Sequence, residues 1–182
     1  MQHRIEWNNL VAFEPRLAEV RAHATALAAA YNHPANAPLL GHTEALGEDD
    51  VIEHYTRLLD QHARPFLFVR DGALAGDGDL RHVTATSAEF AFLIADPAAQ
   101  GQGLGTRFAT MVHAFAFGPL ALAEVYASVI PANVASRRVF EKLGYIPDTR
   151  EVDPGDLALV VTRTAFESRH AAAMAEIAIA VR

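Results

Sequence analysis

The spacing of apolar residues along the chain alternates between the period of strands and the period of helices. Residues 89–95 alternate in the manner of a strand, with Phe90, Phe92 and Ile94 on one face. Further on, apolar side chains recur at the i, i+3, i+4, i+7 spacing of an amphipathic helix at Phe108, Met111, Val112 and Phe115. The pattern therefore predicts a strand, a turn begun by Asp96-Pro97, and a helix that starts near Gly103.

The same patterns predict seven strands and four helices before the C-terminal tail. The strands are expected at residues 5–13, 65–70, 73–83, 89–95, 125–130, 150–152 and 157–163. Helices are expected at residues 14–30 and 49–62, from Gly103 onward, and between the caps Asn133 and Gly144. The predicted order is strand, helix, helix, three strands, helix, strand, helix and two strands. This order predicts an α/β (α+β) fold, a mixed sheet covered by helices, in one domain over residues 1–182.

Two further features of the organisation follow from this order. Residues 89–95 and 125–130 flank the third helix, so we expect them to be parallel and joined by a right-handed crossover. The alanine-rich tail, residues 165–182, is expected to be helical and to serve as a docking helix or a dimer element. A membrane-surface helix is disfavoured because the tail has no basic face.

Composition narrows the class of protein. The 182 residues include no cysteine, which excludes disulfides, thiolate metal sites and a cysteine nucleophile. The nine histidines show no zinc-type spacing, so no metal is expected. The chain lacks both an apolar signal region near its N-terminus and a membrane-spanning run, so a cytoplasmic protein without membrane contact is expected. The net charge of −7 argues against nucleic acid and favours a cationic partner.

A glycine-rich segment lies between the strand at residues 89–95 and the following helix. Its sequence is Gln100-Gly101-Gln102-Gly103-Leu104-Gly105-Thr106. Glycine permits positive φ and close backbone approach, so the free amides of a helix N-terminus can converge on an anion such as phosphate. A Walker loop is excluded because Thr106-Arg107 replaces its Lys-Ser or Lys-Thr pair. A Rossmann loop is disfavoured because Thr106 replaces its third glycine. A glycine-rich helix entry without a ligand remains an alternative.

The spacing Gln-x-x-Gly-x-Gly resembles the pyrophosphate-binding signature of the GCN5-related N-acetyltransferases, the GNAT superfamily. A second segment strengthens the resemblance because it comes in the order and spacing that the family shows. It reads Asn133-Val134-Ala135-Ser136-Arg137-Arg138-Val139-Phe140-Glu141-Lys142-Leu143-Gly144-Tyr145. Ser136, Glu141-Lys142 and the alanine-rich tail look closest to the ribosomal-protein N-terminal acetyltransferase-like branch, which also includes acetyltransferases of drugs and small amines.

This resemblance implies a GNAT-like fold over residues 5–163, with a mixed, mostly antiparallel seven-stranded sheet and helices on both faces. It also implies acetyl-CoA as co-substrate, bound where the strands at 89–95 and 125–130 splay apart. The expected coenzyme-binding residues are Leu93, Ile94, Gln100, Gly101, Gln102, Gly103, Leu104, Gly105, Thr106, Asn133 and Ser136. A backbone amide near Leu93 or Ile94 would polarise the thioester carbonyl.

The same resemblance implies transfer of the acetyl group to a primary amine by direct attack in a ternary complex. Glu89 takes the position of the family's catalytic glutamate, which acts through water; an ordinary exposed carboxylate is the alternative. Phe140 departs from the family pattern, in which a tyrosine protonates the leaving thiolate. Ser136 could instead hydrogen-bond the sulfur, and Tyr126 and Tyr145 are alternative acids.

The acceptor is expected to be a small-molecule amine or a peptide or protein N-terminus, with no nucleic acid, and a homodimer is an open alternative to a monomer. Phe140 leaves open a noncatalytic acyl-CoA-binding module. A purely structural or dimerising protein is the third reading.

Overall fold

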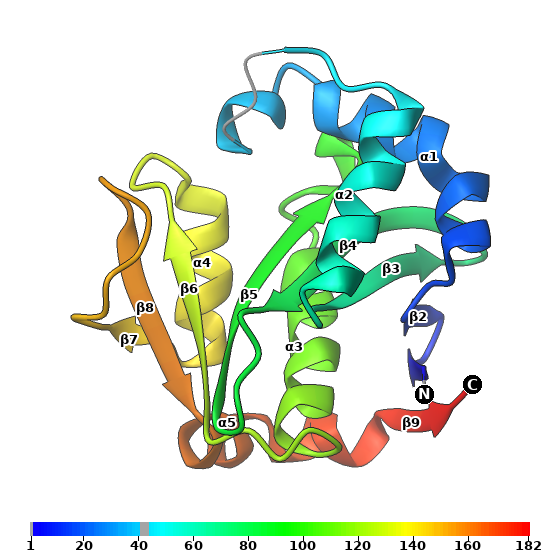
Figure 1. The fold of residues 1–182 in the computed structure, drawn as a ribbon. Coiled ribbons are helices and arrows are strands. Elements are labelled where there is room, and N and C mark those ends of the chain that lie inside the picture. Colours follow the sequence, from blue (N-terminus) through cyan, green and yellow to red (C-terminus); the bar gives the residue numbers. More distant parts are fainter. Residues whose placement is uncertain (1, 41–43) are drawn as a thin grey trace.

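A mixed sheet of nine strands runs through residues 2–40 and 44–182, the part of the chain that the computed structural model describes (Figure 1). The strands lie in the order β7-β8-β6-β5-β4-β3-β2-β1-β9. All neighbouring strands are antiparallel except β5 and β6. The strands are β1 (His3–Trp7), β2 (Leu10–Phe13), β3 (Arg64–Arg70), β4 (Ala73–Arg81), β5 (Ser87–Ile94), β6 (Glu124–Val129), β7 (Ile146–Pro147), β8 (Leu157–Thr162) and β9 (Ala178–Val181).

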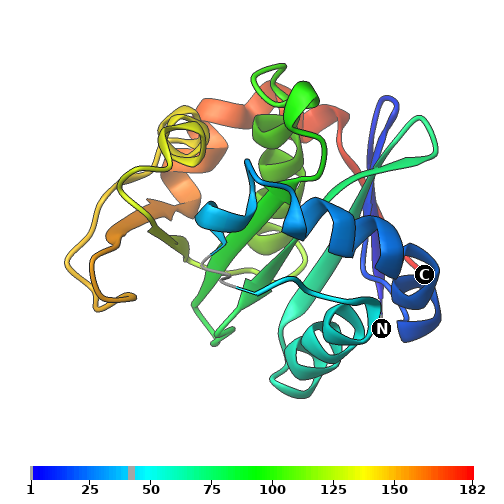
Figure 2. The ribbon, with the colours of Figure 1, turned by 90° about the horizontal axis from the view of Figure 1, so that it is seen from above.

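Helices cover both faces of this sheet, as predicted (Figure 2). They are α1 (Leu17–Asn32), α2 (Glu48–Asp60), α3 (Leu104–Phe117), α4 (Val134–Leu143) and α5 (Arg163–Glu176), with short 3₁₀ turns at Ala37–Leu39 and Pro97–Ala99. On one face, α1 and α2 pack against β2 and β3 through a cluster that includes Val20, Leu27, Tyr55 and Leu67. The helices α3, α4 and α5 lie on the other face. The predicted mixed, mostly antiparallel architecture is therefore confirmed, with nine strands in place of seven.

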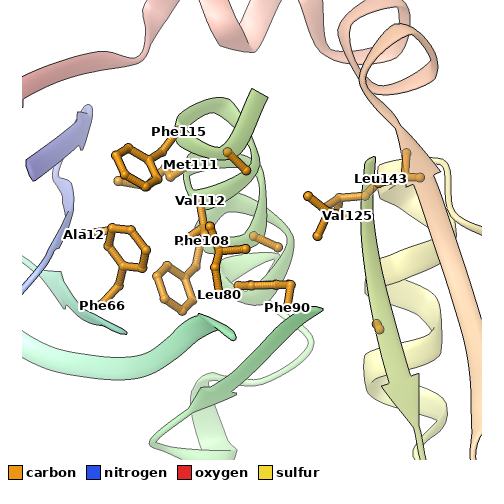
Figure 3. Close-up of a cluster of buried hydrophobic side chains, with 14 of the residues drawn as sticks. Ala12, Phe66, Leu80, Phe90, Phe108, Met111, Val112, Phe115, Val125 and Leu143 are labelled. Atoms are coloured by element: carbon orange, nitrogen blue, oxygen red, sulfur yellow. The ribbon is translucent and has the colours of Figure 1, made fainter. Parts of the chain in front are cut away.

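The larger apolar core lies between α3 and the sheet (Figure 3). The predicted stripe of α3, Phe108, Met111, Val112 and Phe115, is completely buried. The ring of Phe108 stacks on Phe68 at 4.5 Å between centroids. Since burying one such side chain contributes roughly 1.5 to 3 kcal/mol, this stripe fixes α3 and the loop that precedes it against the sheet.

The strands β5 and β6 separate after a short parallel contact. Only three register pairs join them, Ser87 with Glu124, Ala88 with Val125, and Glu89 with Tyr126. From Phe90 onward β5 pairs with β4 alone. The middle of the sheet is therefore split at the end of β5 that leads into the glycine-rich segment.

The N-terminal prediction of one strand over residues 5–13 is wrong. The chain reverses at Asn8-Asn9, so that β1 and β2 form a hairpin with Trp7 opposite Leu10. Asn8 has a φ of 56°, a left-handed conformation that asparagine tolerates better than most residues. Asn8-Asn9 breaks the apolar alternation of Ile5, Trp7, Val11 and Phe13, and this break could have indicated the reversal.

Two C-terminal predictions also need correction. The predicted strand at residues 150–152 is absent, and the edge strand is the shorter β7, paired with β8. The tail is helical only as far as Glu176, because residues 178–181 form β9 and pair with β1. Phe166 is fully buried in the core, which fits the docking interpretation of the tail, whereas the dimer interpretation stays a prediction. The alanine-rich sequence of β9 gave a helical signal that pairing with β1 overrides.

Candidate active site

The glycine-rich segment forms an open turn at the N-terminus of α3. Gly101 and Gly103 have φ values of 76° and 82°, the left-handed region that favours glycine. A β-carbon placed on either residue would meet no heavy atom within 4 Å. The space in front of both glycines is therefore free for a ligand to approach the backbone.

The backbone amides of this turn have no partners. Across the described residues, none of the amides of residues 101–106 donates a hydrogen bond, and the first intrahelical donor is Arg107 to the carbonyl of Gly103. The helix dipole adds a partial positive charge at the same place. A phosphate group would satisfy several of these donors together, so the turn fits the diphosphate of a coenzyme A molecule.

The two glutamines of the glycine-rich segment stabilise the turn through side-chain hydrogen bonds. The side-chain nitrogen of Gln100 donates to Oδ1 of Asn36 (3.1 Å) and to the carbonyl of Ile94 (3.2 Å). The side chain of Gln102 donates to the carbonyl of Ala98 at 3.0 Å. These bonds hold the turn against the end of β5 and the loop after α1.

Gly105 serves packing. A β-carbon there would lie 3.1 Å from the ring of Phe92 and 3.4 Å from Val139, so only glycine allows this close approach of α3 to β5 and α4. Leu104 is 5% exposed, which leaves only its amide to face a ligand. The motif thus combines ligand-facing amides with residues that hold them in place.

Backbone alternation decides which amides of β5 face the gap beside β6. The amide of Ala95 donates to Ala75 on β4, and the carbonyl of Leu93 approaches Gly76 on the same strand. Because successive residues of a strand point their backbone groups in opposite directions, the amide of Leu93 faces β4. The amides of Ile94 and Phe92 face the gap. Phe92 was not predicted, although its parity with Ile94 could have indicated it.

A cavity of about 650 Å³ opens beside this gap. Its lining includes residues of β5, the end of β6, and Asn133, Ser136 and Phe140 of the α4 region. On the other side, it is lined by residues of α1, α2 and β4. This volume suits a small-molecule substrate.

Glu89 lies where this cavity meets a second one of about 260 Å³, since it lines both. Its side chain is 15% exposed, and Oε2 lies 3.1 Å from Nδ1 of His82. The His82 side chain is 65% exposed. Glu89 is therefore a carboxylate held at the cavity wall, with an imidazole between it and solvent.

The start of α4 brings two predicted residues to the cavity. Asn133 caps the helix, since its Oδ1 accepts from the amide of Ser136 at 3.0 Å. Ser136 lines the cavity, and its hydroxyl forms no hydrogen bond with any described residue. One turn later, Phe140 is 3% exposed and packs edge-on against Phe92. A hydroxyl at Ser136 and an inert ring at Phe140 therefore face the same space.

The two alternative acids lie in different surroundings. Tyr145 is buried behind Phe140, and its hydroxyl lies 2.7 Å from Nε2 of His113. Nδ1 of His113 contacts the carbonyl of Ala109, so it carries the ring proton, and Tyr145 donates to Nε2. Burial lowers the pKa of His113 to about 3, which keeps this ring neutral. Tyr145 is therefore engaged in the core.

Tyr126 lines only the smaller cavity. Its ring lies under the Arg150 guanidinium at 4.1 Å. Partial burial, together with the negative charge of Glu89, raises the pKa of the Tyr126 hydroxyl. It is less acidic than an ordinary tyrosine.

The far wall of the cavity holds a carboxylate that was not predicted. Asp77 on β4 is 7% exposed, and its Oδ2 accepts hydrogen bonds from the hydroxyls of Tyr31 and Tyr55, the second at 2.8 Å. Burial raises the pKa of Asp77 to about 6, although both hydroxyl donors favour the charged form. No sequence signal indicates this cluster, because its members come from α1, α2 and β4.

Next to it, Asp79 pairs with Arg81 through two hydrogen bonds of 2.6 and 2.5 Å. This ion pair neutralises Asp79 within the sheet. Asp77, Asp79 and Arg81 alternate along β4, so all three side chains point to the face covered by α1 and α2.

Two features are absent from residues 2–40 and 44–182, the described part of the chain. These residues include no group of three or more His, Cys, Asp or Glu side chains that could hold a metal ion. None of their helices has both the length and the apolar character needed to cross a membrane.

A split mixed sheet, with a glycine-rich turn of unpaired amides at the end of β5, agrees with the acetyltransferase class of the GNAT fold that the two sequence motifs imply. The model of the Acetyltransferase (GNAT) domain family matches residues 16–146. The chain belongs to this family, which confirms the resemblance. A comparison with curated protein sequences gave no match.

Solved structures show the same fold at low sequence identity. RimJ of Mycobacterium smegmatis, in complex with CoA-disulfide, has a TM-score of 0.73 and 21% identity over 97% of this chain and 94% of that one. A ribosomal-protein-S5-alanine acetyltransferase from Vibrio fischeri has a TM-score of 0.70 and 15% identity over 90% and 98%. Spermidine N-acetyltransferase from Vibrio cholerae, in complex with CoA and spermine, has a TM-score of 0.69 and 18% identity over 87% and 98%. The neighbours include a ribosomal-protein acetyltransferase, as the predicted branch implies.

Proposed function

We propose that this protein transfers an acetyl group from acetyl-CoA to a primary amine by direct attack in a ternary complex. One observation carries the proposal: the unpaired amides of residues 101–106 lead into the gap beside β5, which opens on the 650 Å³ cavity. Donor and acceptor can therefore meet without leaving the protein.

The backbone provides the donor site. The amides of residues 101–106 hold the diphosphate, and Gly101 and Gly103 leave it room. Acetyl-CoA supplies a thioester whose carbonyl must be polarised. The amides of Ile94 and Phe92 face the gap and are the donors for that carbonyl, worth roughly 3 kcal/mol for one preorganised donor. Leu93 lines the cavity with its side chain.

Glu89 removes the proton from the acceptor ammonium, through water, before attack. At pH 7 deprotonating an alkylammonium with a pKa near 10.4 costs about 4 to 5 kcal/mol, so a positioned base matters. His82, at 3.1 Å from Glu89 and largely exposed, offers a route for the proton to solvent.

The leaving group needs little help. Phe140 cannot donate a proton, but a thiol has a pKa near 8.5 and leaves readily as a thiolate. The unbonded hydroxyl of Ser136 is placed to hydrogen-bond the sulfur. Replacement of the family's tyrosine by Phe140 is thus compatible with catalysis.

The acceptor is a small-molecule amine or the N-terminus of a peptide or protein. Carboxylates along the cavity favour a cationic acceptor, and the volume suits a small molecule. The structural neighbours that act on spermidine and on ribosomal protein S5 support both acceptor kinds.

Calorimetry with coenzyme A and thiol release from acetyl-CoA with a panel of amines test the proposal. Coenzyme binding together with amine-dependent thiol release is expected. Binding with no turnover for any amine would favour the noncatalytic acyl-CoA-binding module that Phe140 suggests. Absence of coenzyme affinity would favour a structural protein.

A further inference from the structure

The Asp77 cluster consists of Asp77, Tyr31 and Tyr55. The carboxylate of Asp77 carries a charge that is not needed to hold the two tyrosine hydroxyls. Oδ2 of Asp77 accepts from Tyr31 and Tyr55, and these bonds join α1 and α2 to β4. A neutral acceptor such as an asparagine oxygen could make the same bonds. An ionised carboxylate this deeply buried is costly unless a cation or further donors compensate it.

No cation of the described residues forms an ion pair or hydrogen bond with Asp77, and the charge of Arg81 acts on it only through space. Arg81 is the nearest arginine on its strand and is engaged by Asp79. Within the described residues, Oδ1 of Asp77 accepts no hydrogen bond, although Asp77 lines the cavity. A buried carboxylate therefore presents an uncommitted oxygen to the space where the acceptor is expected.

The rest of the cavity has the same sign of charge. Its described lining contains seven carboxylates and two arginines. Arg81 is paired as above, and Arg57 lies 3.8 Å from Glu53 on the exposed side of α2. A positively charged group in the cavity would thus meet net negative charge from several sides.

The side chains of Asp77 and Glu89 lie on the same face of the sheet but are separated along the direction of the strands. Asp77 is opposite Leu93, and Glu89 is opposite Arg81, so the two carboxylates lie four residue positions apart along paired strands. At about 3.3 Å per residue this separation is roughly 13 Å. An elongated acceptor can therefore reach both.

The structure assigns Asp77 to a second ammonium group of the acceptor, so that the acceptor class is a linear diamine or polyamine. The assignment rests on the proposed function of the cavity. Glu89 acts at the reacting amine, and Oδ1 of Asp77 binds the distal ammonium by a charge-assisted hydrogen bond.

The test compares α,ω-diamines with amino alcohols of the same chain length, whose distal end is polar but uncharged. For wild-type protein, kcat/KM for the best diamine should exceed that of its amino alcohol at least about tenfold, as a hydrogen bond between charged groups implies. Asp77→Asn keeps an oxygen for both tyrosines but places an NH₂ group toward the cavity. It should reduce this preference to within about twofold, mainly through KM.

Glu53→Gln is the matched control, because it removes one carboxylate from the same cavity at a side chain that is 68% exposed. It should leave the preference within about twofold of wild type, since exposed charges are screened. Three outcomes would overturn the assignment. The ratio of kcat/KM for diamine to that for amino alcohol could be near one in wild type at every chain length, it could stay unchanged in Asp77→Asn, or it could fall equally in Glu53→Gln.

A binding measurement separates this assignment from the proposed function. Calorimetry of diamine and amino alcohol against the coenzyme A-saturated protein should show tighter diamine binding in wild type and none of that advantage in Asp77→Asn. If no amine is acetylated but the diamine advantage depends on Asp77, the proposed function fails and the assignment stands. If amines are acetylated without that dependence, the assignment fails alone. Should Asp77→Asn fold poorly, Tyr55→Phe, which keeps the carboxylate but removes one hydroxyl that favours its charged form, must keep the diamine preference at pH 8.

Discussion

The proposed donor and acceptor sides of this cavity are built by different means. The donor side consists of backbone amides from one contiguous segment, residues 101–106, and from β5. The acceptor side consists of side chains that α1, α2 and β4 bring together, with Asp77 and Tyr31 separated by 46 residues. A backbone site depends on φ angles and open space, so it tolerates many side chains. A side-chain site depends on particular charges and can change its ligand by single substitutions.

The largest effect is expected from a substitution that blocks the proposed donor site. Gly103→Leu should weaken coenzyme A binding by at least about 100-fold, because its side chain fills the open space and loss of two phosphate contacts costs about 3 kcal/mol or more. Gly72→Leu is the matched control, since Gly72 has nearly the same φ of 81° and equal open space in a remote turn. Both variants should lose similar thermal stability, but only the first should lose heat of coenzyme binding in calorimetry. Normal affinity in Gly103→Leu contradicts the donor site.

The next largest effect is expected at Glu89, the proposed base, which lies between the proposed donor and acceptor sides. Glu89→Gln should lower kcat about 100-fold, the range of a lost general base, with coenzyme affinity unchanged. The deficit should shrink as the pH rises toward the pKa of the amine, since free amine then forms without a base. Asp153→Asn removes a carboxylate from the same cavity and should change kcat little. Steady-state rates across a pH series provide the measurement, and a pH-independent deficit argues against the base role.

A smaller effect tests the acceptor side without any ligand. The pKa of Asp77 is raised to about 6 from 3.8, so its contribution to folded-state stability is present at low pH and is lost as pH rises through 6. Asp77→Asn cannot titrate. Its free energy of unfolding, relative to wild type, should therefore increase by about 1 kcal/mol between pH 5 and pH 8. Urea unfolding at several pH values measures this; a difference constant with pH would mean that Asp77 does not titrate in this range.

The smallest effect concerns the leaving group. Ser136→Ala should lower kcat about threefold, as expected for one neutral hydrogen bond, and leave coenzyme affinity unchanged. Ser128→Ala is the control, because Ser128 also lines the cavity but its hydroxyl donates to Asp156 at 2.8 Å. If thiol release is equally fast in wild type and Ser136→Ala, the hydroxyl has no part in the departure of the thiolate.

The difference between a site made by one contiguous segment and a site made by distant elements also explains how much the sequence could predict. The glycine loop and the apolar stripe of α3 were predictable because each depends on residues within about fifteen positions. Asn133 and Gly144 mark the ends of α4 as predicted. These local features carried the family resemblance, which is confirmed, and the donor site that is proposed from it.

Features that depend on distant partners were not predictable from one sequence. The strand β9 forms because Ile179 pairs opposite the buried Ile5 at the other end of the chain. The Asp77 cluster likewise needs α1 and α2 folded over β4 before its members meet. Helical and strand periods describe local order, whereas these contacts depend on tertiary arrangement.

The separation of β5 from β6 gives the sheet two inner edges, one on each strand, in addition to its two outer edges. Outer edges of sheets are hazards because their free peptide groups can recruit other chains. Here α3 and α4 lie on one face of the split, and the cavity beside it gives a thin arm carrying amide groups access to the edge of β5. A bound pantetheine arm would act as a short non-peptide strand that completes the sheet. Occupancy should then slow amide hydrogen exchange at Phe92 and Ile94, which would link substrate loading to the local stability of β5.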